Sequence, residues 1–77
     1  MKLVEAISKK VSNLLKERNL SQYSLFKNGG VPRTTVNDVV NCRKGRVSTD
    51  TIYQICTTLG ITLGEFFSDQ MFDELDD

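Results

Sequence analysis

The chain has 77 residues, with ten Lys and Arg against ten Asp and Glu, two Cys and no His. This length allows one domain with one hydrophobic core, because so short a chain buries only about 60% of its unfolded surface. The composition argues against an enzyme: a zinc site lacks ligands, and a Cys nucleophile lacks its His base. No metal or cofactor is therefore predicted, and Cys42 and Cys56 are expected to be reduced structural thiols.

The zero net charge conceals a segregation along the sequence. Residues 2–46 hold all ten basic residues and three acids, a charge of +7, whereas residues 47–77 hold seven acids and no base, a charge of −7. A basic half suits a polyanion; alternatively, the fold interleaves both halves on its surface. The chain has neither an apolar run that would cross a membrane nor a secretory leader, so a cytoplasmic location without membrane contact is expected.

The first predicted helix covers about four turns, and its apolar residues recur at the spacing of one helical face. We expect it to end near Arg18 or Asn19, because basic residues suit a helix C-terminus and Asn tolerates the left-handed conformation. The apolar stripe consists of Leu3, Val4, Ile7, Val11, Leu14 and Leu15.

A second helix, capped by Ser21 and carrying Leu25 and Phe26, is expected to stop at Asn28-Gly29-Gly30. A third follows over residues 32–41, with Pro32 at or just before its first turn. Its outer side chains are of the kind that read base edges in a major groove; the alternative is an ordinary solvated face. The helical period places Val36, Val39 and Val40 inside, and Thr34, Asn37, Asp38 and Asn41 outside, with Arg33 in the first turn.

A basic loop, residues 42–47, precedes a fourth helix that Ser48 or Thr49 caps and Gly60 ends. Thr62 and Glu65 form the capping-box pattern of a short fifth helix. No strand pattern occurs, so the fold class is all-α with five helices. The apolar residues of the last two helices are Ile52, Ile55, Cys56, Leu59, Leu63, Phe66 and Phe67.

Three spaced motifs resemble the Xre family of helix-turn-helix regulators, the group of phage repressor and Cro domains, over about residues 7–67. They are Leu20-Ser21-Gln22-x-x-Leu25, Gly30-Val31-x-Arg33-x-Thr35-Val36, and the run from Ile52 to Leu59-Gly60-Ile61-x-Leu63-x-Glu65-Phe66-Phe67. The resemblance implies a lambda-repressor-like domain of five helices. In this family the second and third helices form the helix-turn-helix, and the third enters the major groove.

The same resemblance implies residue roles in a small transcriptional regulator, in particular a repressor, that binds a palindromic double-stranded DNA operator. The base-reading residues would be Arg33, Thr34, Asn37 and Asp38. The residues on the DNA backbone would be Gln22, Thr35, Asn41, Arg43 and Lys44. The alternative is a protein-interaction module, such as the antitoxin of a toxin–antitoxin pair, which binds a protein partner through its acidic tail and also binds its own operator.

The sequence departs from the family pattern at the end of the third helix, where Glu-x-Gly is common and Val40 and Cys42 stand instead. We expect Asn41 to supply the left-handed residue of the exit turn. The arginine that the family often pairs with that glutamate is replaced by Leu15, which makes an apolar pair with Val40 self-consistent.

A further departure is Phe26, which stands where the family usually has alanine. We expect the small Val36 and Val39 to make room for its ring.

Residues 1–68 are predicted to form the DNA-binding domain, and residues 69–77 an acidic tail. Helical spacing of its apolar residues favours packing over a free anionic arm that competes with DNA. We expect the tail to extend the fifth helix and to pair with a second copy, giving a homodimer on two half-sites; alternatively, the strip folds back on its own domain. The expected interface residues are Phe66, Phe67, Met71, Phe72 and Leu75.

Overall fold

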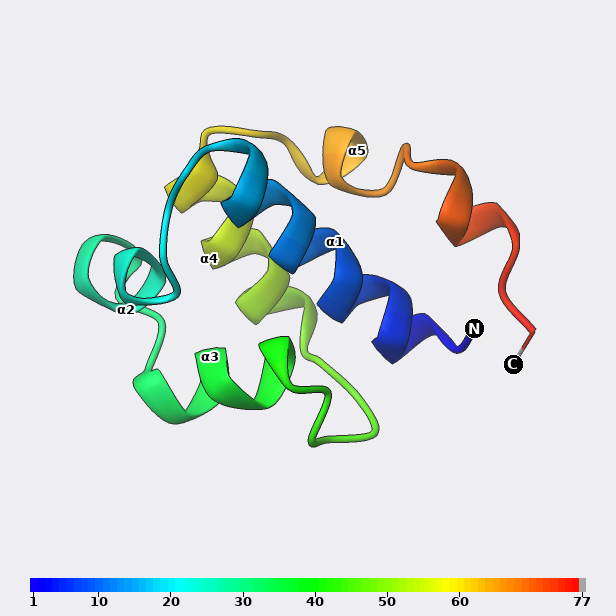
Figure 1. Ribbon diagram of the computed structural model, residues 1–77, viewed down its shortest axis with the longest axis horizontal. Coiled ribbons are helices and arrows are strands. Elements are labelled where there is room, and N and C mark those ends of the chain that lie inside the picture. The colour runs from blue at the N-terminus through cyan, green and yellow to red at the C-terminus, as the bar shows by residue number, and fades with distance from the viewer. Residues whose placement is uncertain (77) are drawn as a thin grey trace.

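The computed structural model describes residues 1–76, which form five α-helices, one 3₁₀ turn and no strand (Figure 1). The predicted all-α fold of five helices is therefore confirmed. In chain order the elements are α1 (Leu3–Glu17), α2 (Tyr23–Gly29), α3 (Arg33–Val40), α4 (Thr49–Leu59), α5 (Leu63–Phe66) and the 3₁₀ turn η1 (Gln70–Asp73). None of these helices is both long and apolar enough to span a bilayer.

Most helix ends follow the local chemistry that the sequence indicates. Asn19 takes the left-handed conformation after α1, with φ 56°, and Gly60 does so after α4, with φ 73°. Ser48, rather than Thr49, caps α4: its Oγ accepts from the Thr51 N–H at 3.2 Å. Thr62 and Glu65 form both bonds of the predicted capping box.

The start of α2 differs from the prediction. Its N-cap position is Gln22, which has helical backbone angles, and no side chain caps the helix. The carbonyls of Ser21 and Gln22 accept from the N–H groups of Ser24 and Leu25 at 3.1 and 3.0 Å. The chain thus enters α2 through a tight backbone turn, and the prediction that Ser21 caps the helix is wrong.

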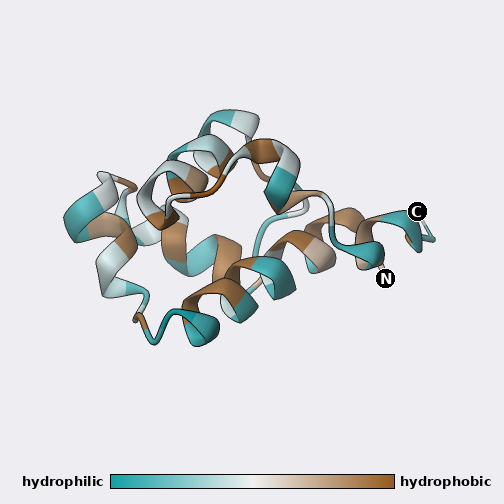
Figure 2. Cartoon of the chain, turned by 90° about the horizontal axis from the view of Figure 1, so that it is seen from above, coloured by the Kyte–Doolittle hydropathy of each residue, from teal (hydrophilic) through white to brown (hydrophobic). Residues whose placement is uncertain are grey.

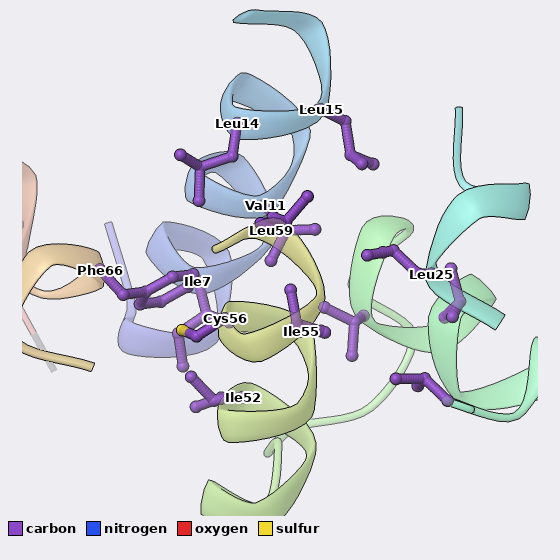
Figure 3. Close-up of a cluster of buried hydrophobic side chains, with 13 residues drawn as sticks. Ile7, Val11, Leu14, Leu15, Leu25, Ile52, Ile55, Cys56, Leu59 and Phe66 are labelled. Carbon is purple, nitrogen blue, oxygen red and sulfur yellow. The ribbon is translucent and has the colours of Figure 1, made fainter. Parts of the chain in front are cut away.

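The hydrophobic core gathers side chains from all five helices (Figure 3). Helix α1 packs on α3, α2 packs on both α3 and α4, and α5 packs on α4. Hydrophobic segments of the helices turn toward one another and hydrophilic ones turn away (Figure 2). Phe66 of α5 is fully buried and lies beside Ile7 and Cys56 (Figure 3). Cys56 and Cys42 are both free thiols, and burial raises the pKa of Cys56. The core cluster consists of Ile7, Val11, Leu14, Leu15, Leu25, Val31, Val36, Val39, Ile52, Ile55, Cys56, Leu59 and Phe66.

The packing of α2 against α4 explains the glycine at position 29. A Cβ at Gly29 would collide with Oγ1 of Thr58. Gly29 remains helical, and the turn out of α2 is made by Gly30, with φ 71°. The two glycines therefore serve different purposes: Gly29 permits helix packing, and Gly30 ends the helix.

The segment after α5 does not extend that helix. Phe67 is its C-cap residue, and a separate turn, η1, begins after Asp69, whose Oδ1 accepts from the Met71 N–H at 3.1 Å. The turn lies against α1, where Lys10 Nζ is 3.4 Å from Asp69 Oδ2. The strip thus folds back on its own domain, as the alternative interpretation held, and the prediction of a longer fifth helix is wrong.

Aromatic packing ties the same segment to the core. The Phe72 ring centroid is 5.8 Å from that of Phe66 and 5.0 Å from that of Phe67. Phe66 is fully buried inside its own chain, so its ring cannot contact a second copy. The prediction that Phe66 lies in a dimer interface is therefore wrong. Phe67 stays 38% exposed, and Met71, Phe72 and Leu75 are half-buried.

Candidate nucleic-acid interface

Helix α3 is anchored to the domain through its inner face. Val36 and Val39 are buried in the core, and Val40 packs at its edge. The Ser8 hydroxyl of α1 donates a hydrogen bond of 2.8 Å to the Val40 carbonyl, one of the C-terminal groups without a partner inside the helix. Ser8 is itself buried, so this bond satisfies a buried hydroxyl and a partly buried carbonyl, and it fixes the end of α3 on α1.

The outer face of α3 carries the predicted base-reading side chains. Arg33, Thr34 and Asn37 are exposed, whereas Thr35 and Asp38 are half-buried. The predicted division of this helix into an apolar inner face and a polar outer face is confirmed. Pro32 precedes the helix without a side-chain cap, so the first N–H groups of α3 receive no side-chain acceptor.

Asn37 and Asn41 form a pair at the end of the outer face. Asn41 Nδ2 donates to the Asn37 carbonyl at 3.0 Å and to Asn37 Oδ1 at 3.2 Å. This arrangement orients the Asn37 side chain and leaves its amide nitrogen available as a donor. Asn41, predicted as a contact to the DNA backbone, also braces a neighbour that is predicted to read bases.

The turn out of α3 is a Schellman motif. Arg43 N–H donates to the Asp38 carbonyl at 2.9 Å, and Cys42 N–H donates to the Val39 carbonyl at 3.3 Å. Cys42 holds the left-handed position, with φ 55°. The expectation that Asn41 would take it is wrong, because the Asn41 N–H still bonds the Asn37 carbonyl at 3.0 Å and keeps φ at −95°.

The loop after this turn presents basic side chains beside α3. Arg43, Lys44 and Arg46 are exposed, and none of them forms an ion pair within residues 1–76. Lys44 and Arg46 line a shallow depression together with Thr35 and Asp38. The Asp38 carboxylate, which would repel phosphate if it stood alone, therefore lies in a depression that it shares with two cations. Sequence reasoning did not select Arg46, because its distance from α3 depends on the path of the loop.

Gln22 lies at the other side of the helix-turn-helix, where α1, α2 and α3 meet. It lines a shallow depression with Lys16, Leu15 and Val40. The predicted apolar pair of Leu15 and Val40 thus faces the same hollow as the predicted phosphate contact. Lys16, on the exposed side of α1, joins this group, and the sequence held no signal to separate it from the other lysines.

Phe26 packs at the edge of the core cluster, which includes Val36 and Val39, and its side chain stays half-buried. That these two small valines make room for the ring stays a prediction. Tyr23 meets it edge-on, with ring centroids 5.0 Å apart at 86°. Arg33 covers it, with Cζ 5.1 Å from the ring centroid.

The charge segregation of the sequence carries over in part to the surface. In Figure 1, α3 and its following loop lie at one edge of the molecule, and α5 with η1 lies at the opposite edge. Asp69 approaches Lys10, and Asp76 Oδ1 lies 3.2 Å from the amino group of Met1. The two halves therefore meet along α1, while the basic side chains near α3 remain apart from the acidic segment.

Comparison with protein families agrees with this geometry. A family model described as a Cro/C1-type helix-turn-helix DNA-binding domain matches residues 10–71, from the middle of α1 to η1. No curated protein and no solved structure matched the chain. The match covers most of the chain, includes the whole helix-turn-helix, and confirms the predicted family. The chain belongs to the family of Cro/C1-type helix-turn-helix DNA-binding domains.

Proposed function

We propose that this protein is a transcriptional repressor that recognises a specific double-stranded DNA operator by placing α3 in the major groove. The observation that carries the proposal is the anchoring of α3, since buried valines and the Ser8 bond hold one face while Arg33, Thr34 and Asn37 point outward. An eight-residue helix is about 12 Å long, comparable to the roughly 12 Å width of the groove.

The outer residues of α3 have distinct chemical roles in this proposal. Arg33 presents a planar fork of donors that suits guanine, and Asn37 offers the amide that suits adenine. Thr34 adds a hydroxyl, and Asp38 accepts from a cytosine amine. The adjoining side chains hold the sugar-phosphate backbone and set the register of α3 without reading sequence. These are Gln22, Thr35, Asn41, Arg43 and Lys44, together with Lys16 and Arg46.

Selection of bound duplexes from a random pool tests the proposal, followed by titration of variants on the selected duplex and on a random one. Arg33→Ala and Asn37→Ala are each expected to cost about 1–3 kcal/mol on the selected duplex and much less on the random one. Asn13→Ala is the matched control for Asn37, because Asn13 is an exposed amide on α1. Equal losses of affinity on both duplexes would show that these residues contact the DNA backbone and not the bases. Failure to recover any preferred duplex would refute sequence-specific binding.

We also propose that two copies associate through Phe67 and through Met71 of η1, so that a two-fold dimer binds two half-sites about one helical turn apart. Support comes from the large ring of Phe67, which is 38% exposed beside Phe72. Phe67→Ser is expected to give a monomer by ultracentrifugation, with weaker binding to a palindrome and unchanged binding to a half-site. A variant that stays dimeric would exclude this surface.

The protein-interaction function has less support. Asp69 and Asp76 of the acidic tail already have cationic partners inside the chain. The segment therefore offers a protein partner less free negative charge than its sequence suggests.

A further inference from the structure

Four side chains form a row across the junction of α2 and α3, with two aromatic rings in the middle and a cation at each end. Lys27 Nζ lies 5.4 Å from the Tyr23 ring centroid, Tyr23 meets Phe26 edge-on, and Arg33 Cζ lies 5.1 Å from the Phe26 centroid. Cations within about 6 Å of a ring centroid are attracted by the negative face of the ring. The row therefore links the first residue of α3 to the outer side of α2 through side chains alone.

The contact between Arg33 and Phe26 leaves the hydrogen-bonding capacity of the guanidinium intact. A cation–π contact uses the negative face of the ring and needs no hydrogen-bond acceptor, so the five N–H donors of the guanidinium stay available for other partners. Within residues 1–76, Arg33 forms no ion pair and its side chain donates no hydrogen bond. An ion pair at this position would hold the side chain equally well but would occupy the donors that a base needs.

The position of the ring is fixed from its inner side. Phe26 packs against the core cluster and is half-buried, and the edge of Tyr23 closes its flank. Tyr23, in contrast, is 51% exposed. Because the core holds Phe26, the guanidinium that lies over its ring is held relative to the whole domain and not only relative to its own helix.

We propose that Phe26 is a positioning residue for Arg33, which orients the guanidinium for a base edge and so contributes to sequence specificity without touching DNA. This inference rests on the proposed function. A long arginine side chain loses rotamer freedom when it binds, and contact with a fixed ring removes part of that loss in advance. Bidentate reading of guanine also depends on the orientation of the guanidinium, which contact with a ring face restricts more than contact with an aliphatic side chain does.

The test compares Phe26→Leu, which keeps an apolar side chain at the edge of the core, with Phe26→Tyr, which keeps the ring. Phe26→Leu is expected to weaken binding to the selected duplex about twofold to fivefold, the size of an exposed cation–π contact, with less effect on random DNA. Phe26→Tyr is expected to bind both duplexes as the wild type does. In an Arg33→Ala background, Phe26→Leu is expected to have no further effect, because the group that it positions is gone.

A second measurement on the free protein needs no DNA. The δ-methylene protons of Arg33 are expected to show an upfield ring-current shift in NMR spectra of the wild type and of Phe26→Tyr, and to lose it in Phe26→Leu. Absence of that shift in the wild type would overturn the inference even if Phe26→Leu failed to fold.

The outcomes separate the inference from the proposed function. If the wild type distinguishes no duplex from random DNA, the proposed function fails, and the inference fails with it. Suppose instead that the wild type does distinguish the two duplexes. If Phe26→Leu then weakens binding to both duplexes equally, or weakens binding as much in the Arg33→Ala background as in the wild type, only the inference is overturned.

Discussion

The two charged regions of this molecule differ in where their partners lie. In the segment after α5, Asp69 approaches Lys10 and Asp76 approaches the terminal amino group, so charge joins parts of the chain to one another. In the loop after α3, Arg43, Lys44 and Arg46 have no ion-pair partner within residues 1–76. Surface pairs contribute little to stability, but unpaired cations beside a polar helix are free for a polyanion. Two carboxylates of the acidic region are therefore paired within the fold, whereas the basic side chains after α3 are free to bind a polyanion.

The largest expected effect on stability comes from Phe66, which ties the acidic segment to the core. Phe66→Ala should lower the free energy of unfolding by about 3–5 kcal/mol, because it empties a fully buried site between α5 and α1. Affinity for DNA per folded molecule should stay unchanged. Chemical denaturation and DNA titration measure the two quantities. Tyr53→Ala, at a ring that is 58% exposed, is the control, and equal losses for the two variants would show that Phe66 is not part of the core.

Ser8 tests the anchor of α3. Ser8→Ala should cost about 1–3 kcal/mol of unfolding free energy, because the Val40 carbonyl loses its donor in a partly buried place. Ser12→Ala is the matched control on the same helix, since Ser12 is half-buried and its hydroxyl forms no hydrogen bond within residues 1–76. If denaturation gave the same small change for both variants, the Ser8 bond would not hold α3 in place.

Cys42 offers a gain in stability beside the basic region. Its backbone stands at φ 55°, where a residue with a Cβ is disfavoured by about 1–2 kcal/mol. Cys42→Gly should therefore raise the free energy of unfolding by about 1 kcal/mol, after the greater flexibility of glycine in the unfolded chain is subtracted. Cys42→Ala keeps the Cβ and should give no such gain. Equal changes in the two variants would contradict a left-handed exit turn.

The smallest expected effect is on the stability of the fold at acidic pH. The Met71 N–H, with a contribution from Lys10, lowers the pKa of Asp69, and the Thr62 N–H lowers the pKa of Glu65. A lowered folded-state pKa gives stability that is present above the ordinary carboxyl pKa of about 4 and is lost as the pH falls through the lowered value. Asp69→Asn keeps the acceptor for Met71 but cannot titrate. In Asp69→Asn the free energy of unfolding should therefore fall less steeply below about pH 4, as measured by denaturation at a series of pH values. An unchanged pH dependence in that range would show that Asp69 does not contribute.

Local patterns in the sequence were sufficient for much of the fold. The stripe of α1, the capping box at Thr62 and the end of α4 at Gly60 each depend on residues a few positions apart, and periodicity or cap chemistry indicates them directly. The outer face of α3 follows from the same helical period.

The features that the sequence did not reveal depend on contacts between distant residues. Ser8 and Val40 are 32 positions apart, and a lone serine beside an apolar stripe gives no sign of a partner. The return of the tail to α1 depends on Lys10 and Asp69, 59 positions apart. At Cys42 the error had another cause: residue preference favoured Asn41, whereas the hydrogen bonds that close α3 place the left-handed residue one position later.

The salt dependence of DNA binding tests the central claim most directly. If the cations beside α3 contact phosphates, log K should fall linearly with log salt, with a slope of about −0.9 for each neutralised phosphate. Arg43→Ala and Lys44→Ala should each reduce that slope by about 1, whereas Lys9→Ala, at an exposed lysine of α1, should leave it unchanged. A binding constant that does not respond to salt, or a Lys9→Ala effect as large as that of Arg43→Ala, would contradict the assignment of the basic region to DNA.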